Sequence, residues 1–186
     1  MDSDLPADPF LQSLPHTQGL PPAVIDLHSR PGRFSGRCSI VRGKGALTAL
    51  ALRIGRFPPT ADDVPVTLTT QHEGCQWTWH RDFGGHKTVS NLYFDTTRGL
   101  VREVIGGLSI WMHPKGSEGK LLLDIAAIKL LGCPCPRVML PRSNSVEWQD
   151  DQGRFCFDVS AWMPGVGPLI RYRGWLTRDH GIRQTT

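Results

Sequence analysis

The sequence has no apolar run long enough to cross a bilayer and no cysteine pattern typical of a disulfide-bonded protein. Its longest apolar stretch, residues 121–132, is interrupted by Asp124 and Lys129 and is shorter than the roughly 20 residues that a membrane-spanning helix needs. Five cysteines, an odd number, argue against a framework of paired disulfides. The start, MDSDLPADPF, has no basic flank or apolar core. We therefore expect no membrane span, no secretory signal and a cytoplasmic location.

Familiar cofactor and catalytic motifs are also missing. The chain contains no GxGxxG, P-loop, GxSxG or HExxH pattern. The Cys-Pro-Cys stretch at 133–135 lacks CxxC spacing, and a structural zinc ion needs four ligands. We expect neither a metal nor a cofactor, and we expect free buried thiols.

The charge is moderately basic, with a formal net charge of +4 and a pI near 9.0. The basic residues are scattered from Arg30 to Arg183, whereas nucleic-acid sites usually cluster them, so we expect no nucleic-acid partner. Arginine outnumbers lysine 16 to 5. Arginine suits bidentate contacts with carboxylates or phosphates, so the composition is compatible with an anionic ligand.

The length of 186 residues suits one domain with its own core. Prolines and glycine in residues 1–19 indicate a flexible arm outside that core. We expect a single β-rich domain over residues 20–178 and a C-terminal tail over 179–186.

Two short helices, near residues 20–30 and from residue 46, precede a long series of period-two segments separated by glycine turns. This pattern predicts a mainly β fold: an antiparallel meander forming a curved sheet or calycin-like barrel, with two or three short helices. The residues before the second helix, 33–43, are also strand-like. Residues 119–130 fit a strand or a helix, and 133–143 indicate a proline-bounded crossover with room for one helical turn. The expected strands are 64–72, 76–83, 86–95, 100–105, 108–114, 119–130, 143–150, 154–163 and 168–177.

The segment WTWHRDFGGHKTVS, residues 77–90, predicts a hairpin because two glycines permit a two-residue turn at Gly84 and Gly85. That register places Phe83 opposite His86 and Arg81 opposite Thr88. Apolar burial turns one face of the hairpin inward. The inward list is Trp77, Trp79, Arg81, Phe83, His86, Thr88, Ser90, Leu92 and Phe94.

The other face of the hairpin carries His80 and Asp82, which we expect in solvent, with an Asp82–Lys87 ion pair. Arg81 and His86 are the candidates on the inward face. Arg81 is either paired to an internal carboxylate, Glu103 or Asp124, or is an anchor for an anionic or carbonyl-bearing ligand.

The last predicted strand alternates two faces, one with Arg171, Arg173 and Trp175, the other with Ile170, Tyr172 and Leu176. The pattern does not decide which face lines the interior. If the arginine face does, Arg173 joins Arg81 inside the barrel.

Several segments resemble one bacterial family, in this order along the chain: LPPAVIDLH, GRFPPTADDVPVTL, WHRDFGGHKTVS, LGCPCPRVMLPRS, GRFCFDV and IRYRGWL. The chain resembles the family called domain of unknown function 4166, whose members occur alone or fused to saccharopine-dehydrogenase-like NAD-binding modules or membrane-protein modules. The family pattern around the hairpin includes Arg81, Phe83, Gly84, Gly85 and Ser90, but it does not include His80 or Asp82. The resemblance implies no activity.

The leading hypothesis is a barrel cavity that binds a lipophilic small molecule with a polar or anionic end. Two alternatives remain open: a cofactor-free isomerase or cyclase with Arg81 as electrostatic stabiliser and His86 as acid/base, or an interaction module that docks on an NAD-dependent oxidoreductase. The predicted cavity wall is Trp77, Trp79, Phe83, Leu92 and Phe94, and the predicted polar end is Arg81, His86 and Arg173.

Overall fold

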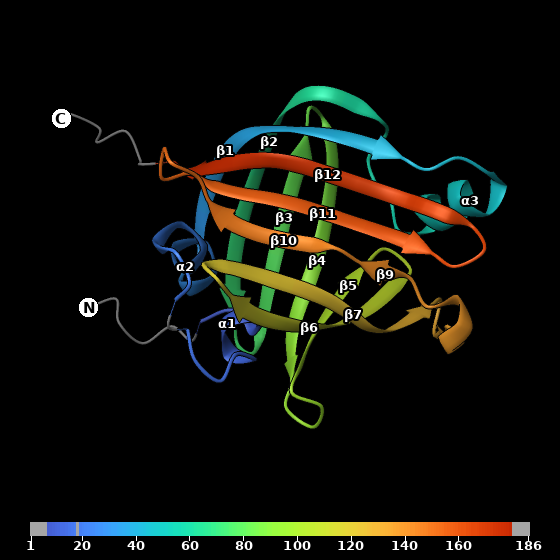
Figure 1. Ribbon diagram of the computed structural model, residues 1–186, viewed down its shortest axis with the longest axis horizontal. Helices are drawn as coiled ribbons and strands as arrows, with labels where there is room; N and C mark the ends of the chain where they lie inside the picture. Colours follow the sequence, from blue (N-terminus) through green and yellow to red (C-terminus); the bar gives the residue numbers. More distant parts are fainter. Residues whose placement is uncertain (1–6, 18, 180–186) are drawn as a thin grey trace.

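The computed structural model describes residues 7–17 and 19–179. They form a closed barrel of ten antiparallel strands, with two further two-residue strands, β8 and β9, beside it (Figure 1). The expected barrel is therefore confirmed. The strands are β1 (Gly32–Arg42), β2 (Ala61–Glu73), β3 (Gln76–Phe83), β4 (His86–Asp95), β5 (Leu100–Ile105), β6 (Leu108–Ser117), β7 (Lys120–Leu130), β8 (Cys133–Pro134), β9 (Arg142–Ser143), β10 (Ser145–Gln149), β11 (Phe155–Met163) and β12 (Gly167–Arg178).

The barrel closes between β10 and β7. The ladder that joins them runs from Ser145 opposite Leu123 to Trp148 opposite Lys120. The residues before Ser145 leave this ladder, and β9 pairs with β11 instead of β7. Closure pairs the two edges that an open sheet would leave exposed. The barrel is thus closed near one end and splayed between β7 and β9 toward the other.

The helices cover the two ends of the barrel (Figure 1). α1 (Pro9–Gln12) and α2 (Pro22–Ser29) lie at the end where β1 begins, and α3 (Ala46–Ile54) lies at the opposite end. A 3-10 turn, η1 (Arg137–Met139), follows β8 in the predicted crossover. Among the described residues, no helix is long and apolar enough to cross a membrane.

The hairpin prediction is confirmed in register as well as in position. Phe83 is opposite His86 and Arg81 is opposite Thr88. Gly84 and Gly85 have φ values of 61° and 101°, which the two-residue turn requires. Residues 120–130 form strand β7, which resolves the ambiguity between strand and helix. The predicted Asp82–Lys87 ion pair is wrong, because Asp82 instead accepts a hydrogen bond from the Gly85 amide at 2.6 Å.

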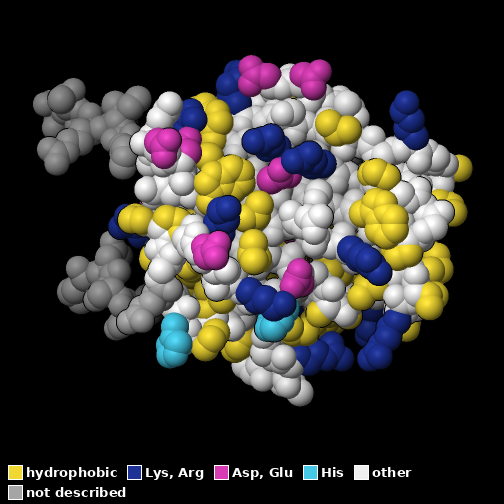
Figure 2. Space-filling model, viewed as in Figure 1, with side chains coloured by type: hydrophobic (Ala, Val, Ile, Leu, Met, Phe, Trp, Pro, Cys, Tyr) yellow, Lys and Arg dark blue, Asp and Glu magenta, His cyan; other side chains and the backbone are white. Residues whose placement is uncertain are grey.

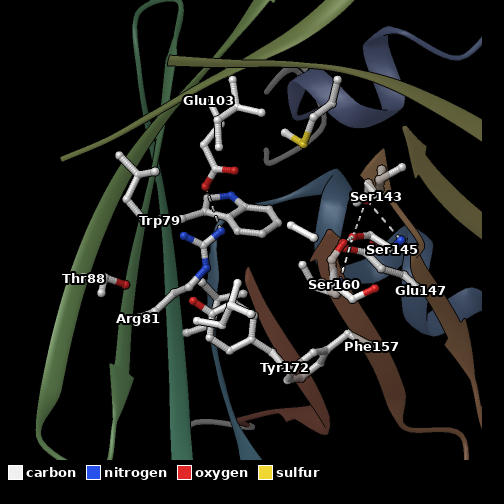
Figure 3. A pocket seen from close by; sticks show the side chains of 18 of the residues that line it. Trp79, Arg81, Thr88, Glu103, Ser143, Ser145, Glu147, Phe157, Ser160 and Tyr172 are labelled. Carbon is white, nitrogen blue, oxygen red and sulfur yellow. Dashed lines mark hydrogen bonds and ion pairs between the residues drawn. The ribbon is translucent and has the colours of Figure 1, made fainter. Parts of the chain in front are cut away.

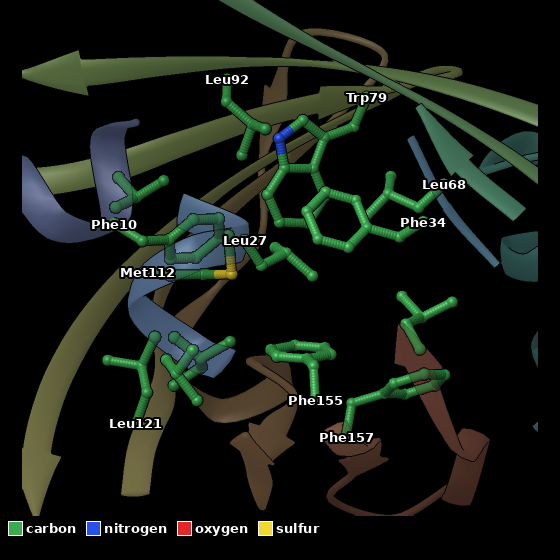
Figure 4. Packing of buried hydrophobic residues seen from close by; sticks show 14 of the residues in the cluster. Phe10, Leu27, Phe34, Leu68, Trp79, Leu92, Met112, Leu121, Phe155 and Phe157 are labelled. Atoms are coloured by element: carbon green, nitrogen blue, oxygen red, sulfur yellow. The ribbon is translucent and has the colours of Figure 1, made fainter. Parts of the chain in front are cut away.

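The packed core fills the barrel at the α1 and α2 end (Figure 4). Trp77, Leu92 and Leu121 are all almost fully buried there. Leu27 of α2 reaches into the same cluster. Burial of these side chains stabilises the closed end and leaves the rest of the interior less densely filled.

The expectation that residues 1–19 lie outside the core is wrong for residues 8–11, which are buried. Phe10 of α1 is only 3% exposed, and its ring centroid lies 5.7 Å from that of Trp79. Asp8 caps α1, since its Oδ1 accepts hydrogen bonds from the amides of Phe10 and Leu11 at 3.0 and 3.3 Å. Apolar contacts and a cap hold this short helix, which four residues could not sustain alone. Residues 180–186 of the expected tail lie outside the described residues.

Candidate functional site

The barrel interior contains a cavity of about 210 Å³. It begins at Leu27 of α2 and extends toward the α3 end, where Phe57, Phe83 and Tyr172 form an aromatic cluster. The rings of Phe83 and Tyr172 stack with centroids 5.6 Å apart. Most of the wall is apolar, including Val66, Leu68, Ile105, Ile110, Met112, Leu123, Ile125, Phe155, Phe157, Val159, Ile170 and Leu176.

Arg81 of β3 is the cationic group of this cavity, and it is already paired (Figure 3). Its guanidinium lies 3.1 Å from a carboxylate oxygen of Glu103 on β5 and donates a hydrogen bond to Ser90 Oγ at 2.8 Å. The same group lies 4.9 Å from the centre of the Trp79 ring. The paired alternative considered for Arg81 is therefore the one observed, with Glu103 as the partner. Asp124, the other candidate, pairs with Lys115 instead.

Two buried polar groups in the cavity wall have no hydrogen-bond partner among the described residues. They are the indole Nε1 of Trp79 and the hydroxyl of Thr88. Both residues are less than 10% exposed, at 6% and 4%. A buried group without a partner costs about 1–3 kcal/mol relative to one that is satisfied. Both groups can donate, so an acceptor atom that came within hydrogen-bond distance of either would relieve this cost.

The opposite wall carries Ser143, Ser145, Ser160 and Glu147 (Figure 3). Ser143 and Ser145 are hydrogen-bonded through their hydroxyls at 2.7 Å, and Ser145 Oγ accepts from the Ser160 amide at 3.2 Å. These bonds link β9 and the start of β10 to β11. Glu147 adds a carboxylate to this side of the cavity.

Glu147 ends a buried chain of ionisable groups. Its Oε2 lies 2.7 Å from Nε2 of His28, and Nδ1 of His28 lies 2.6 Å from Oδ2 of Asp8. Burial alone would lower the pKa of His28, but the two neighbouring carboxylates raise it to about 10. His28 is thus an imidazolium near neutral pH. Burial raises the pKa of Asp8 above its usual range, although His28 opposes this effect.

The predicted wall residues are divided between cavity and core. Trp79 and Phe83 line the cavity. Trp77 and Leu92 are buried in the packed core but lie outside the cavity wall. Phe94, near the end of β4, is half-buried and does not line the cavity either.

Two predicted polar residues lie outside the cavity. His86 comes directly after the hairpin turn, where its Nε2 donates to the Arg56 carbonyl oxygen at 3.0 Å beneath α3. Alternation correctly gives its side of the strand, but its side chain lies beneath α3 and does not line the cavity. Arg173 is exposed on the outer face of β12, because Tyr172 and Leu176 occupy the inward positions. The interpretation with Arg173 inside the barrel is therefore wrong.

Sequence reasoning missed Glu147, His28 and Tyr172 as site residues. For Tyr172 a signal existed, since it shares a face with Ile170 and Leu176. Burial raises the pKa of its phenol. Glu147 and His28 are 119 positions apart, and the packing of α2 against β10 brings them together.

All five cysteines are free, and Cys38 and Cys156 are buried. Burial raises the pKa of each of these two thiols to about 11. Cys133 is exposed, and Cys135 beside it is half-buried. Over residues 7–17 and 19–179, no group of three or more His, Cys, Asp or Glu side chains is placed to hold a metal ion.

Comparison with known proteins gives a family but no activity. No curated protein matches the chain. A family model described as a domain of unknown function, DUF4166, matches residues 20–176, which span every strand of the barrel apart from the last residues of β12. The chain therefore belongs to the DUF4166 family.

Proposed function

We propose that the protein binds one small lipophilic molecule inside the barrel and holds its polar end with Trp79 and Thr88. The observation that carries this proposal is the pair of unpartnered donors, Trp79 Nε1 and Thr88 Oγ1, on two residues that line an otherwise mostly apolar cavity. Binding sites of this kind combine an apolar wall with a few polar groups that orient the ligand.

The volume limits the size of the ligand. An apolar cavity of about 150 Å³ in another protein takes up benzene. At about 210 Å³, this cavity has room for a ring or short chain with one polar substituent. A long fatty acid or a sterol would not fit without movement of the wall.

The charges favour an uncharged polar end. Arg81 is neutralised by Glu103, and Glu147 contributes a second carboxylate to the cavity. An anionic ligand would have to displace Glu103 from Arg81 and leave that carboxylate unpaired, which is costly in a buried site. A carbonyl or hydroxyl oxygen can accept from Trp79 and Thr88 without this cost.

The first experiment is native mass spectrometry of freshly purified protein, followed by denaturing extraction of any bound compound. We expect one apolar molecule per chain, with a carbonyl or hydroxyl group. A second experiment titrates labelled protein by NMR with acetophenone, 1-phenylethanol and benzoate, which have similar sizes. We expect the first two to shift cavity resonances and benzoate to bind more weakly. Protein that is purified empty and binds none of the three contradicts the proposal and favours an interaction module.

A second candidate function is acid–base catalysis on the bound molecule by Glu147. The supporting observation is the hydrogen-bonded chain from Glu147 through His28 to Asp8, which fixes the position of a carboxylate whose residue lines the cavity. A carboxylate held in this way can take a proton from a carbon beside a carbonyl group and return it at another position. His86, the acid/base residue expected from the sequence, lies outside the cavity.

Exchange of carbon-bound hydrogen with solvent tests this candidate. Acetophenone is incubated with the protein in D2O, and deuterium in its methyl group is followed by NMR. Catalysis predicts faster exchange with the wild type than with Glu147→Gln, and no loss in His86→Gln. Equal rates in Glu147→Gln and the wild type would exclude Glu147 as the base for this probe.

A further inference from the structure

Exposed apolar side chains gather at the α3 end of the barrel. Of the eight large hydrophobic side chains that the described residues expose, only Val89 lies on the side of the barrel. Leu131 approaches Ile54 of α3 across Gly107, so the loop after β7 adjoins the helix. We call these residues the apolar rim: Val41, Leu47, Leu50, Leu131, Val138, Met139 and Trp162.

Cations without carboxylate partners surround the apolar rim. On the rest of the barrel, arginines such as Arg37, Arg154 and Arg178 form ion pairs. At the α3 end, Arg171, opposite Val41, is paired with Asp158. Eight other cations at this end form no ion pair in the part of the chain that the structure describes: Arg42, Lys44, Arg53, Arg56, Lys87, Lys129, Arg137 and Arg142. Figure 2 shows hydrophobic side chains mixed with Lys and Arg at this end, while Asp and Glu lie further to the left.

Some of these cations line a groove between α3 and the β3–β4 hairpin. Arg42, Arg53, Arg56 and Lys87 contribute to its wall together with His86, and no carboxylate does. Cations crowded in this way repel one another unless an anion lies between them. The groove is therefore suited to a phosphate group.

We propose that the α3 end of the barrel docks on the surface of an anionic membrane, with the apolar rim among the lipid headgroups and the surrounding cations on the lipid phosphates. Proteins that lie on membranes combine these two features, because apolar insertion and attraction to anionic lipid add. A nucleic acid would use the cations but gain nothing from exposed leucines on α3. The aromatic cluster of Phe57, Phe83 and Tyr172 lies between this end and the cavity.

Vesicle co-sedimentation of the full chain tests the proposal. The vesicles are phosphatidylcholine alone, or phosphatidylcholine and phosphatidylglycerol in equal amounts. We expect binding to the mixed vesicles, much weaker binding to phosphatidylcholine alone, and loss of binding at high salt. The double variant Lys44→Gln with Arg53→Gln should weaken binding about 25-fold.

A matched variant removes the same charge elsewhere. Lys120→Gln with Arg173→Gln neutralises two exposed cations that lie away from the α3 end and have no ion-pair partner among the described residues. It should change binding by less than about twofold. If both double variants weaken binding equally, the attraction reflects net charge only, and the proposed docking face is wrong.

A second matched set tests the apolar rim. Leu47→Ser with Leu50→Ser should weaken binding at least about tenfold, whereas Val89→Ser, at a side chain of similar exposure, should not. No sedimentation with mixed vesicles, or binding to duplex DNA in place of vesicles, would overturn the proposal. Vesicle binding needs no occupant of the cavity, so its failure would leave the ligand proposal intact.

Discussion

Nε2 of His28 lies 2.7 Å from Oε2 of Glu147, which joins α2 to the strand that closes the barrel. Asp8 holds the other ring nitrogen at 2.6 Å, so one imidazolium bridges two carboxylates without contact with solvent. Removing one partner from such a group leaves an uncompensated buried charge. The contact therefore ties the N-terminal helices, the closing strand and one wall of the cavity together.

The free energy of unfolding should fall as the pH rises from neutral toward 10. The pKa of His28 is about 10 in the folded state and near 6.5 when unfolded, so the folded state holds one more proton between these values. This extra stability is complete below about pH 6.5 and decreases by up to about 1.4 kcal/mol per pH unit until His28 loses its proton. Denaturant unfolding at several pH values measures this decline in the free energy of unfolding.

Two variants make the assignment to His28 specific. His28→Gln should unfold more easily and lose most of the decline with pH, whereas His80→Gln, exposed on β3, should keep the wild-type profile. Should His28→Gln fail to fold, Glu147→Gln removes one carboxylate and should move the decline to lower pH. An unchanged slope in these variants would refute the role of His28.

Thr88→Val should stabilise the empty protein. The variant keeps the side-chain volume and removes a buried hydroxyl that has no partner, so we expect a gain of about 1 kcal/mol. Thr70→Val is the matched control, because the Thr70 hydroxyl accepts from the Gly32 amide at 3.0 Å. The free energy of unfolding of Thr70→Val should be about 1 kcal/mol lower than that of the wild type. Thermal unfolding of the ligand-free proteins compares the two, and destabilisation in both would mean that Thr88 has a partner.

Glu103→Gln should change the preferred charge of the ligand. The substitution leaves Arg81 in the cavity without its carboxylate, so benzoate should bind about tenfold more tightly, equivalent to about 1.4 kcal/mol. The affinity for acetophenone should change little. Asp124→Asn removes the same charge from the outer surface and should alter neither affinity. Isothermal titration of the three proteins distinguishes the local effect from a change in net charge.

Phe10→Ala should destabilise the whole barrel. The ring packs against His28 and Trp79, with centroids 5.0 and 5.7 Å away, so its removal leaves a cavity in the core. We expect a loss of about 3–5 kcal/mol. Gln12→Ala, on the exposed side of the same helix, should cost less than about 0.5 kcal/mol. A small effect of Phe10→Ala would restore the interpretation of this segment as a loosely attached arm.

The sequence predicts best those features that depend on local alternation and turn chemistry. Gly84 and Gly85 determine the register of their hairpin, and that register places Arg81 inside the barrel. Arg173 shows the limit of this reasoning, because Trp175 shares its face, so both faces of the strand carry a large apolar side chain. The same limit applies to α1, whose four residues have little helical tendency of their own and depend on the packing of Phe10.

Contacts between distant segments account for the rest of the candidate site. No local pattern indicates that Glu147 meets His28, since their contact depends on how α2 packs against β10. Alternation predicts the correct face of β4 for His86. Its place beneath α3, outside the cavity, depends on where the helix packs.

The capping of α1 by Asp8 has a consequence for how the domain is delimited. Sequence similarity places the start of the family domain at residue 20, yet Asp8 and Phe10 precede it and are buried. A fragment that begins at residue 20 would keep every strand but leave His28 with a single acidic partner and the space of Phe10 empty. The unit of folding is therefore longer than the unit of family resemblance, and any shortened version of this protein needs to begin before Asp8.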